Sequence, residues 1–152
     1  MSTSTPNSIV IAPLPWTDSE PFWQATSRGE LYIQRCPDTG RYLFPPTPRS
    51  PFGTHRQPVW EQVSGRGRIW SYIVAHPPLI GQFAAWAPYV SVLVELEEDS
   101  QVRLPGLLIS ESGALPGPDH PTTMRIGDPV WVDLTESAGD YVVPRWSLVE
   151  PR

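Results

Sequence analysis

Few side chains in this sequence could transfer a proton or attack a substrate near neutral pH. There are three histidines, His55, His76 and His120, and one cysteine, Cys36. Each histidine falls in a predicted loop near proline, and no serine or cysteine stands at a spacing typical of a catalytic triad. His76, at the end of a long predicted strand, is the best candidate for a base. The pattern as a whole predicts no catalytic residue on this chain, although His76 keeps open the alternative of an enzyme in its own right.

Residues 65–68, Gly-Arg-Gly-Arg, look at first like a glycine-rich loop that binds phosphate. The third glycine and the following helix of a dinucleotide site are missing, so the segment is better interpreted as the bulged start of a strand. Arg66 and Arg68 then point to the same side. Their guanidinium groups could bind phosphates in a bidentate manner or pair with carboxylates of a partner, and the enrichment of arginine at protein interfaces favours the partner.

An uncharged, apolar connection spans residues 77–88, whereas most loops run through solvent. Its apolar side chains include Leu79, Ile80, Phe83, Ala84, Ala85 and Trp86, and Tyr89 follows directly. Something must cover these side chains. Either the loop folds back onto its own domain, or it closes a channel or docks on a partner. The acidic stretch at 95–99 lacks the spacing of a calcium loop and predicts a solvated hairpin end.

Composition narrows the class of protein. The 152 residues fit one domain, and the formal charge is −5 with 11 basic residues that are all arginines. The absence of lysine excludes Schiff-base chemistry and a P-loop. The negative charge opposes general nucleic-acid binding. Aromatic residues on predicted strands still leave open a site for single-stranded nucleic acid: Trp60, Trp70, Tyr72, Tyr89, Trp131, Tyr141 and Trp146.

A single cysteine excludes an internal disulfide. The sequence has no apolar run of about 18 residues and no basic N-terminal signal. We therefore expect a soluble, cytoplasmic protein that does not contact a membrane.

The chain divides into three predicted parts. Residues 1–16 are rich in Ser, Thr and Pro and predict a flexible tail. Residues 17–58 contain one helix, with capping residues from Thr17 to Glu20 and a C-cap at Gly29, followed by a short strand and a proline-rich connector. Residues 59–152 predict five or six strands, at 59–63, 68–75, 89–97, 102–109, 129–134 and 141–149. This number and length of strands predict a mainly β protein with a five-stranded barrel of the OB-fold type.

Several separated blocks of the sequence follow one another in a distinctive order. Phe22-Trp23 is followed by GELYIQRC at 29–36, FPP at 44–46, VSGRGRIWSY at 63–72, PYV at 88–90 and RIGDPV at 125–130. Together these blocks resemble the DUF35 family. The resemblance covers residues 21–149 and implies a short helix, a rubredoxin-like zinc ribbon and an OB-fold barrel. It also implies a small partner of thiolase-superfamily proteins that handle acyl-CoA thioesters, with the reactive groups on the thiolase-like chain.

Under this resemblance we expect a non-catalytic accessory subunit of a thiolase, an acyltransferase or a sterol side-chain aldolase, which completes the channel for the coenzyme A thioester. We expect Phe22 and Trp23 to contact the partner. Coenzyme A or the partner is expected to contact Arg66, Arg68, Trp70, Tyr72, Leu79, Ile80, Phe83, Trp86 and Tyr89. The chain itself would carry no cofactor. A free-standing acyl-CoA or lipid binding protein and a nucleic-acid-binding OB fold are the alternatives.

The sequence departs from the family at the metal ligands of the ribbon. Family members commonly carry two Cys-x-x-Cys knuckles, because a structural zinc takes four ligands in tetrahedral geometry. The corresponding positions here are Cys36, Thr39, Ser50 and Gly53, so three of the four thiolates are missing. Asp38 or His55 would have to substitute without a recognised spacing. We therefore expect no zinc, and we interpret Cys36 as a remnant ligand rather than a nucleophile.

Overall fold

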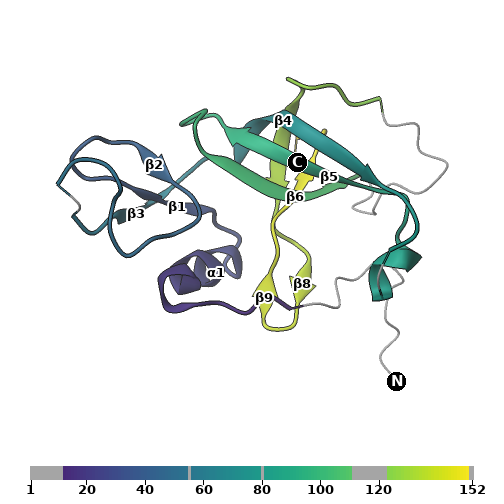
Figure 1. Cartoon of the computed structure of the whole chain (residues 1–152), viewed down its shortest axis with the longest axis horizontal. Helices are drawn as coiled ribbons and strands as arrows, with labels where there is room; N and C mark the ends of the chain where they lie inside the picture. The colour runs from purple at the N-terminus through teal and green to yellow at the C-terminus, as the bar shows by residue number, and fades with distance from the viewer. Residues whose placement is uncertain (1–11, 55, 80, 111–122, 151–152) are drawn as a thin grey trace.

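The chain folds into a mainly β structure with one short helix before the strands, as the sequence predicts (Figure 1). The computed structural model describes residues 12–54, 56–79, 81–110 and 123–150. The first eleven residues of the predicted tail lie outside the described residues, as do His55, Ile80 and His120.

The helix begins with a short 3₁₀ turn, η1 (Thr17–Ser19), and continues as α1 (Glu20–Thr26). The hydroxyl of Ser19 accepts a hydrogen bond from the backbone N–H of Trp16 at 3.0 Å, which holds the start of the turn. At the other end Gly29 has a φ of 77°, and the N–H of Glu30 donates to the carbonyl of Ala25 at 3.0 Å. The helix itself ends at Thr26 with Ser27 as its C-cap, so the prediction of the C-cap at Gly29 is wrong by two residues. Gly29 instead ends the turn that follows, in a backbone conformation that only glycine takes without strain.

A small three-stranded sheet follows the helix, and we call it the ribbon sheet. It consists of β1 (Tyr32–Arg35), β2 (Tyr42–Leu43) and β3 (Val59–Gln62), in the order β2-β1-β3. The sequence pattern had assigned the strand at 59–63 to the barrel, but β3 pairs with β1, with Gln34 opposite Trp60. Alternation of apolar and polar residues identifies a strand, but it does not identify the neighbour with which that strand pairs.

The predicted five-stranded barrel is present and closed, in the order β10-β6-β5-β4-β7. Its strands are β4 (Arg66–Ala75), β5 (Tyr89–Leu96), β6 (Arg103–Ile109), β7 (Pro129–Asp133) and β10 (Arg145–Ser147). The short last strand closes the barrel, because Trp146 lies opposite Leu108 in a parallel pairing with β6 and opposite Val132 in an antiparallel pairing with β7.

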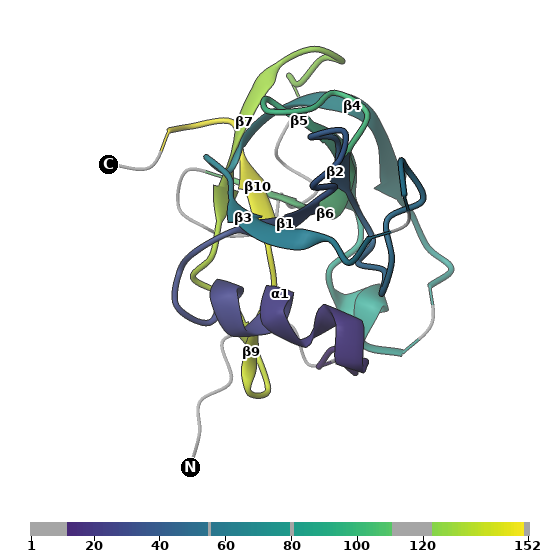
Figure 2. The same ribbon diagram turned by 90° about the vertical axis from the view of Figure 1, so that its left-hand side faces the viewer.

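One continuous core joins the barrel to the ribbon sheet and the helix. Trp146 is fully buried in the barrel, and the core extends through Leu104 to Ile33 in the ribbon sheet and Phe22 on α1. Gly106 is required beside Trp146, since a Cβ at this glycine would lie 2.7 Å from the indole Cδ1. Seen from the ribbon end, α1 runs across one side of the ribbon sheet, with the barrel behind (Figure 2).

Two small elements complete the fold near the groove described below. A 3₁₀ turn, η2 (Gly81–Ala85), follows β4, and a hairpin of β8 (Ser137–Ala138) and β9 (Tyr141–Val142) precedes β10. The hairpin contacts α1, since the Trp23 and Tyr141 ring centroids are 6.0 Å apart. The hairpin therefore helps to hold α1 against the barrel.

Candidate binding groove

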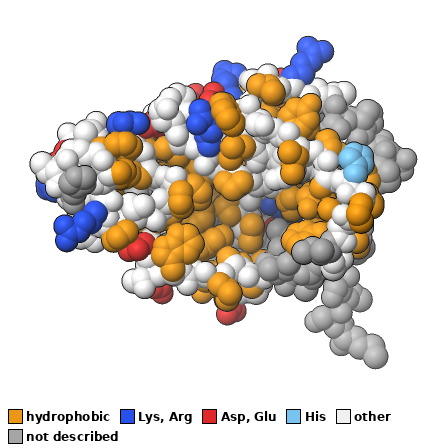
Figure 3. All heavy atoms as spheres, in the orientation of Figure 1, with side chains coloured by type: hydrophobic (Ala, Val, Ile, Leu, Met, Phe, Trp, Pro, Cys, Tyr) orange, Lys and Arg blue, Asp and Glu red, His pale blue; other side chains and the backbone are white. Residues whose placement is uncertain are grey.

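A groove of about 370 Å³ lies between α1 and the barrel strands β5 and β6. Its apolar lining includes Trp23 on the helix, Phe44 after β2, Leu107 on β6, and Pro105, Val143 and Pro144. Apolar side chains gather over this part of the surface in Figure 3. A groove with this lining is suited to an apolar ligand or an apolar segment of another protein.

Aromatic packing fixes the helical wall of the groove. Phe22 is 4% exposed and sits in the core, and Trp23 meets it edge to face with ring centroids 5.0 Å apart. Phe44 contributes a second ring, 5.7 Å from Phe22. Such aromatic pairs add about 0.5–1.5 kcal/mol beyond the burial of their area, so this wall is well defined before anything binds. Both residues predicted to face a partner, Phe22 and Trp23, line the groove.

Arg145 is the one charged residue among the described residues that line the groove. Its side chain is 6% exposed, and its guanidinium contacts Asp133 at 2.8 Å and Glu136 at 3.4 Å. Burial raises the pKa of Asp133, but hydrogen bonds from Arg145 and Thr135 outweigh it and hold this pKa below its ordinary value. The carboxylate is thus kept ionised to neutralise the guanidinium, and neither group is suited to proton transfer near neutral pH.

A second apolar cluster adjoins the groove through Leu107. Trp86, which is 7% exposed, packs with Ile109 of β6 and against Phe83, Tyr89 and Leu107. The centroids of the Phe83 and Trp86 rings are 5.4 Å apart, in an edge-to-face arrangement. The apolar connection at 77–88 therefore folds back onto its own barrel at Trp86, which was one of the alternatives left open by the sequence.

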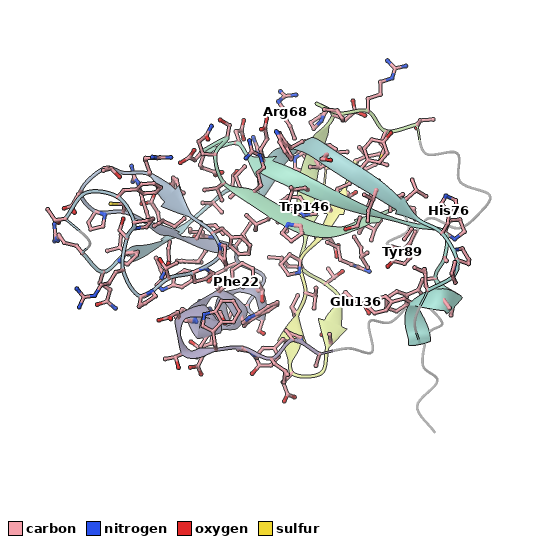
Figure 4. All side chains as sticks on the ribbon, in the orientation of Figure 1. Phe22, Arg68, His76, Tyr89, Glu136 and Trp146 are labelled. Atoms are coloured by element: carbon pink, nitrogen blue, oxygen red, sulfur yellow. The ribbon has the colours of Figure 1, made fainter. Side chains whose placement is uncertain are left out.

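The two arginines predicted to bind coenzyme A or a partner lie at the other end of β4. Arg66 and Arg68 line a separate pocket of about 380 Å³ that also contains Glu95 and Glu97. Arg66 is 3.9 Å from Glu150 in an exposed ion pair, and Arg68 donates to the carbonyl of Gly127 at 3.1 Å. The carboxylates in this pocket oppose the binding of a phosphate. Figure 4 shows Arg68 well away from Phe22 and Tyr89.

Trp70 and Tyr72 lie on β4 between these two ends. They are 46% and 40% exposed, and the neighbouring Ile73 is 63% exposed. The guanidinium carbon of Arg103 lies 4.2 Å from the centroid of the Trp70 ring, so a cation–π contact covers part of this ring. The structure thus distributes the predicted contact residues along the whole of β4 and its neighbours instead of gathering them in one site.

Two of the candidate catalytic residues, His76 and Cys36, lie among the described residues. His76 is exposed just after β4, and its imidazole makes no hydrogen bond or ion pair with another described residue; Figure 4 shows it at the far end of the barrel from Phe22. Cys36 is fully buried in the ribbon. Within the described ranges there is no group of three or more His, Cys, Asp or Glu side chains that could hold a metal ion.

Sequence reasoning missed most of the groove. Pro105 and Leu107 on one segment and Val143, Pro144 and Arg145 on another belong to no motif, and the block that contains Phe44 gave this residue no role in a groove. The one available signal was the isolated arginine after Val143-Pro144, since a charge within an apolar strand requires a partner when it is buried.

The fold and the groove together define a two-part protein, in which an OB-type barrel carries an N-terminal helix and a ribbon sheet. Residues 60–135 match the family model "ChsH2, C-terminal OB-fold domain", and residues 23–49 match "ChsH2, rubredoxin-like zinc ribbon domain". A solved structure titled "Ltp2-ChsH2(DUF35) aldolase" is 30% identical, with a TM-score of 0.72, and the match covers 90% of this chain and 98% of that one. The chain therefore belongs to the ChsH2 family of DUF35 proteins, as the sequence blocks predicted.

Two curated relatives match 86% of the chain. The "Probable enoyl-CoA hydratase alpha subunit" of Thermomonospora curvata is 33% identical, and the "3-oxo-4,17-pregnadiene-20-carboxyl-CoA hydratase alpha subunit" of Mycobacterium tuberculosis is 32% identical. This chain spans only 38% and 36% of their respective lengths. A DUF35 protein from Sulfolobus solfataricus, 10% identical with a TM-score of 0.57 over 86% of this chain and 84% of that one, shares the fold. No helix among the described residues is long and apolar enough to cross a membrane.

Proposed function

We propose that this chain is a non-catalytic partner subunit of an enzyme that acts on an acyl-CoA thioester, and that a thiolase-superfamily chain in the same complex carries the reactive groups. The observation that carries the proposal is the apolar groove between α1 and β6. Its walls suit an apolar acyl group or an apolar partner segment, and its buried arginine is held by two carboxylates. Such a surface positions a substrate and excludes water without transferring protons.

The names of the relatives suggest the class of reaction. Two are called hydratase subunits, and the similar solved structure is called an aldolase. Hydration of an enoyl thioester gives a β-hydroxyacyl thioester, which is the type of compound that a retro-aldol reaction cleaves. In that cleavage the β-hydroxyl loses its proton, the bond between the α and β carbons breaks, and the α carbon gains a proton. The products are a carbonyl compound and a shorter acyl-CoA.

We assign this chain to the cleavage step, because the match to the solved aldolase chain covers 98% of that chain, whereas this chain spans only 38% and 36% of the hydratase relatives. Both reactions need an acid and a base, and the proposal places these groups on the partner. In the described residues the carboxylates next to the groove, Asp133 and Glu136, are bound to Arg145, and His76 lies at the far end of the barrel. Because the chain spans little more than a third of the hydratase relatives, their catalytic residues can lie in the part that it does not match.

The groove residues, and not Arg66 and Arg68, are the expected centre of contact with the acyl group or the partner. The two arginines share their pocket with acidic side chains, so we expect them to make peripheral contacts with the partner. Trp70 and Tyr72 are exposed aromatic residues of the kind that interfaces use, and we expect the partner to extend along β4 to reach them.

Reconstitution tests the proposal. The full chain is co-expressed with a thiolase-superfamily protein from the same organism, and cleavage of a β-hydroxyacyl-CoA is followed through release of the shorter acyl-CoA. We expect a stable hetero-oligomer that cleaves the thioester, and no cleavage by this chain alone. Turnover by the isolated chain, or partner activity that does not change when this chain is added, would contradict the proposal.

Calorimetry separates this proposal from a free-standing carrier. The isolated chain is titrated with a long-chain acyl-CoA and with coenzyme A. We expect weak or no binding, because one wall of the proposed channel belongs to the partner. Tight binding of the acyl-CoA to the isolated chain would favour a carrier that works without a partner.

A further inference from the structure

The ribbon keeps a fixed shape although its residues do not fit the zinc ion that the family description names. The match to the "rubredoxin-like zinc ribbon domain" covers residues 23–49. At the four expected ligand positions Cys36 provides the single thiol, Thr39 and Ser50 provide hydroxyls, and Gly53 provides no side chain. Neutral hydroxyl groups are poor zinc ligands, so this set cannot complete a tetrahedral site.

The space of the fourth ligand is already filled. A Cβ at Gly53 would lie 2.8 Å from Cβ of Asp38 and 2.9 Å from its Oδ2, and Gly53 has a φ of 66°. A side chain cannot stand at position 53 while Asp38 keeps this orientation, and the backbone there disfavours any residue except glycine. The Asp38 side chain therefore occupies the space that a side chain at position 53 would need.

Asp38 ties the first ribbon loop to the second. Its Oδ2 accepts hydrogen bonds from the backbone N–H of Thr54 at 3.0 Å and from the Thr54 hydroxyl at 2.5 Å, and Arg56 is 3.2 Å from Oδ1. Hydrogen bonds from Thr54, together with the nearby Arg56, outweigh the effect of burial and hold the pKa of Asp38 below its ordinary value. A structural zinc ion likewise joins two loops, because its ligands come from both of them.

Buried contacts around Cys36 join the same loops a second time. Its thiol donates to the carbonyl of Phe52 at 3.6 Å, and the Ser50 hydroxyl donates to that carbonyl at 3.1 Å. The guanidinium of Arg41 lies 3.9 Å from the centroid of the Phe52 ring.

A third set of contacts crosses all three strands of the ribbon sheet. Glu61 on β3 accepts hydrogen bonds from the Tyr42 hydroxyl on β2 at 2.5 Å and from Arg35 on β1 at 2.9 Å. Burial and the bond to Glu61 raise the pKa of Tyr42 to about 12, so its hydroxyl stays a donor over the whole physiological range. The hydrogen bonds of Glu61 therefore connect all three strands of the ribbon sheet without a metal ion.

We infer that this ribbon is metal-independent, and that the contacts of Asp38, supported by those of Cys36 and Glu61, replace the zinc ion of the family. The loss of three thiolates then means that the Asp38 contacts, instead of a zinc ion, cross-link the two ribbon loops. The ribbon should hold α1 and the groove in place equally well in the presence of a chelator. His55 lies outside the described residues. Because metal analysis is done on the full chain, it also detects any metal ion that His55 binds.

Two measurements on the full chain test this inference. Elemental analysis after purification in zinc-supplemented medium should find less than about 0.1 zinc per chain, and the unfolding temperature should not change with EDTA or added zinc. Near-stoichiometric zinc, or an unfolding temperature that falls with EDTA, would overturn the inference. These readouts use the unmodified protein and do not depend on its activity.

Asp38→Asn provides a third measurement, with Asp140→Asn, a substitution of an exposed aspartate of the β8–β9 hairpin, as the matched control. We expect Asp38→Asn to lower the unfolding temperature by about 5 °C, because the carboxylate loses its charge-assisted bonds, and Asp140→Asn to leave it unchanged. Equal effects of the two substitutions would show that Asp38 is not a cross-link. If Asp38→Asn fails to fold, the zinc analysis of the unmodified chain still decides the question.

Discussion

Pro105→Asp is the sharpest test of the groove, because Pro105 lines it from an exposed position on β6. A charge at an exposed site should change the stability of the free chain little. If a partner or an acyl group covers the groove, however, the new carboxylate must lose water without a cation to pair with, since Arg145 already has two carboxylates. Burying an unpaired carboxylate costs several kcal/mol, and a conservative value of about 3 kcal/mol weakens association about 100-fold.

The matched control is Pro129→Asp. Pro129 is also an exposed proline on a barrel strand, but it lines the acidic pocket with Arg68 instead of the groove. Calorimetry would measure Kd for the thiolase-superfamily partner, and thermal unfolding would show that both variants fold. We expect a large loss of affinity for Pro105→Asp alone. Equal affinities for Pro105→Asp and the unmodified chain, or a larger loss for Pro129→Asp, would refute the assignment of the groove as the contact surface.

Three further predictions concern stability and catalysis. Asp133→Asn should destabilise the fold by about 2 kcal/mol at pH 7, or about 4–8 °C, because the buried Arg145 loses the negative charge that lies 2.8 Å from its guanidinium. The folded state lowers the pKa of Asp133, so the ionised carboxylate stabilises the fold at any pH above its ordinary pKa near 4. This stabilisation is lost as the pH falls through the lower pKa of the folded state. When thermal unfolding is measured from pH 7 to 2.5, the unfolding temperature of the variant should therefore fall less steeply in acid than that of the unmodified chain. Gly67→Ala should lower the unfolding temperature by several degrees, because the new Cβ would lie 2.4 Å from the carbonyl oxygen of Glu95; an unchanged value would show that β4 and β5 can separate there. His76→Ala should leave the rate of the reconstituted complex unchanged, and a large loss of kcat would return His76 to the reaction.

The sequence was sufficient for features that depend on local chemistry. The positive φ of Gly29, the helix before it and the barrel strands β4, β5, β6 and β7 follow from glycine, capping residues and alternation, all of which act within a few residues. The single strand expected at 141–149 was wrong, because the structure divides it into β9, which pairs with β8, and β10, which closes the barrel. The family blocks were also local. The pairing of strands does not depend on local chemistry alone. The segment of β3 has the pattern of a barrel strand, yet β3 pairs with β1, because alternation does not specify a neighbour.

The candidate site was harder to predict because it is assembled from distant segments. The sequence placed Arg66 and Arg68 in the same contact set as the apolar connection, but β4 separates them by its full length of ten residues. The position of Arg145 in an apolar segment indicated that it needs a partner if it is buried, but it did not identify that partner, since its counter-ions stand 12 and 9 positions earlier in the chain. The groove exists only because α1, β6 and the segment before β10 meet around a shared core.

The shared core also links the ribbon to the groove. A change in the ribbon and a change in the groove should therefore affect stability and partner binding differently. Phe22 packs in the same cluster as Ile33 of the ribbon sheet and Leu104 of the barrel, so the ribbon supports the helical wall of the groove. Asp38→Asn weakens that support without changing any groove side chain. Its effect on binding is set by the fraction of chains that remain folded, because the apparent Kd equals the intrinsic Kd divided by the competent fraction.

At a temperature well below unfolding nearly all chains remain folded, so Asp38→Asn should change Kd for the partner by less than about 1.2-fold while it lowers the unfolding temperature. Pro105→Asp should do the opposite. Calorimetry and thermal unfolding of both variants therefore separate the two ideas. A loss of affinity in Asp38→Asn at low temperature would mean that the ribbon itself touches the partner, whereas an unaltered unfolding temperature would remove Asp38 from the framework of the ribbon and leave the groove assignment intact.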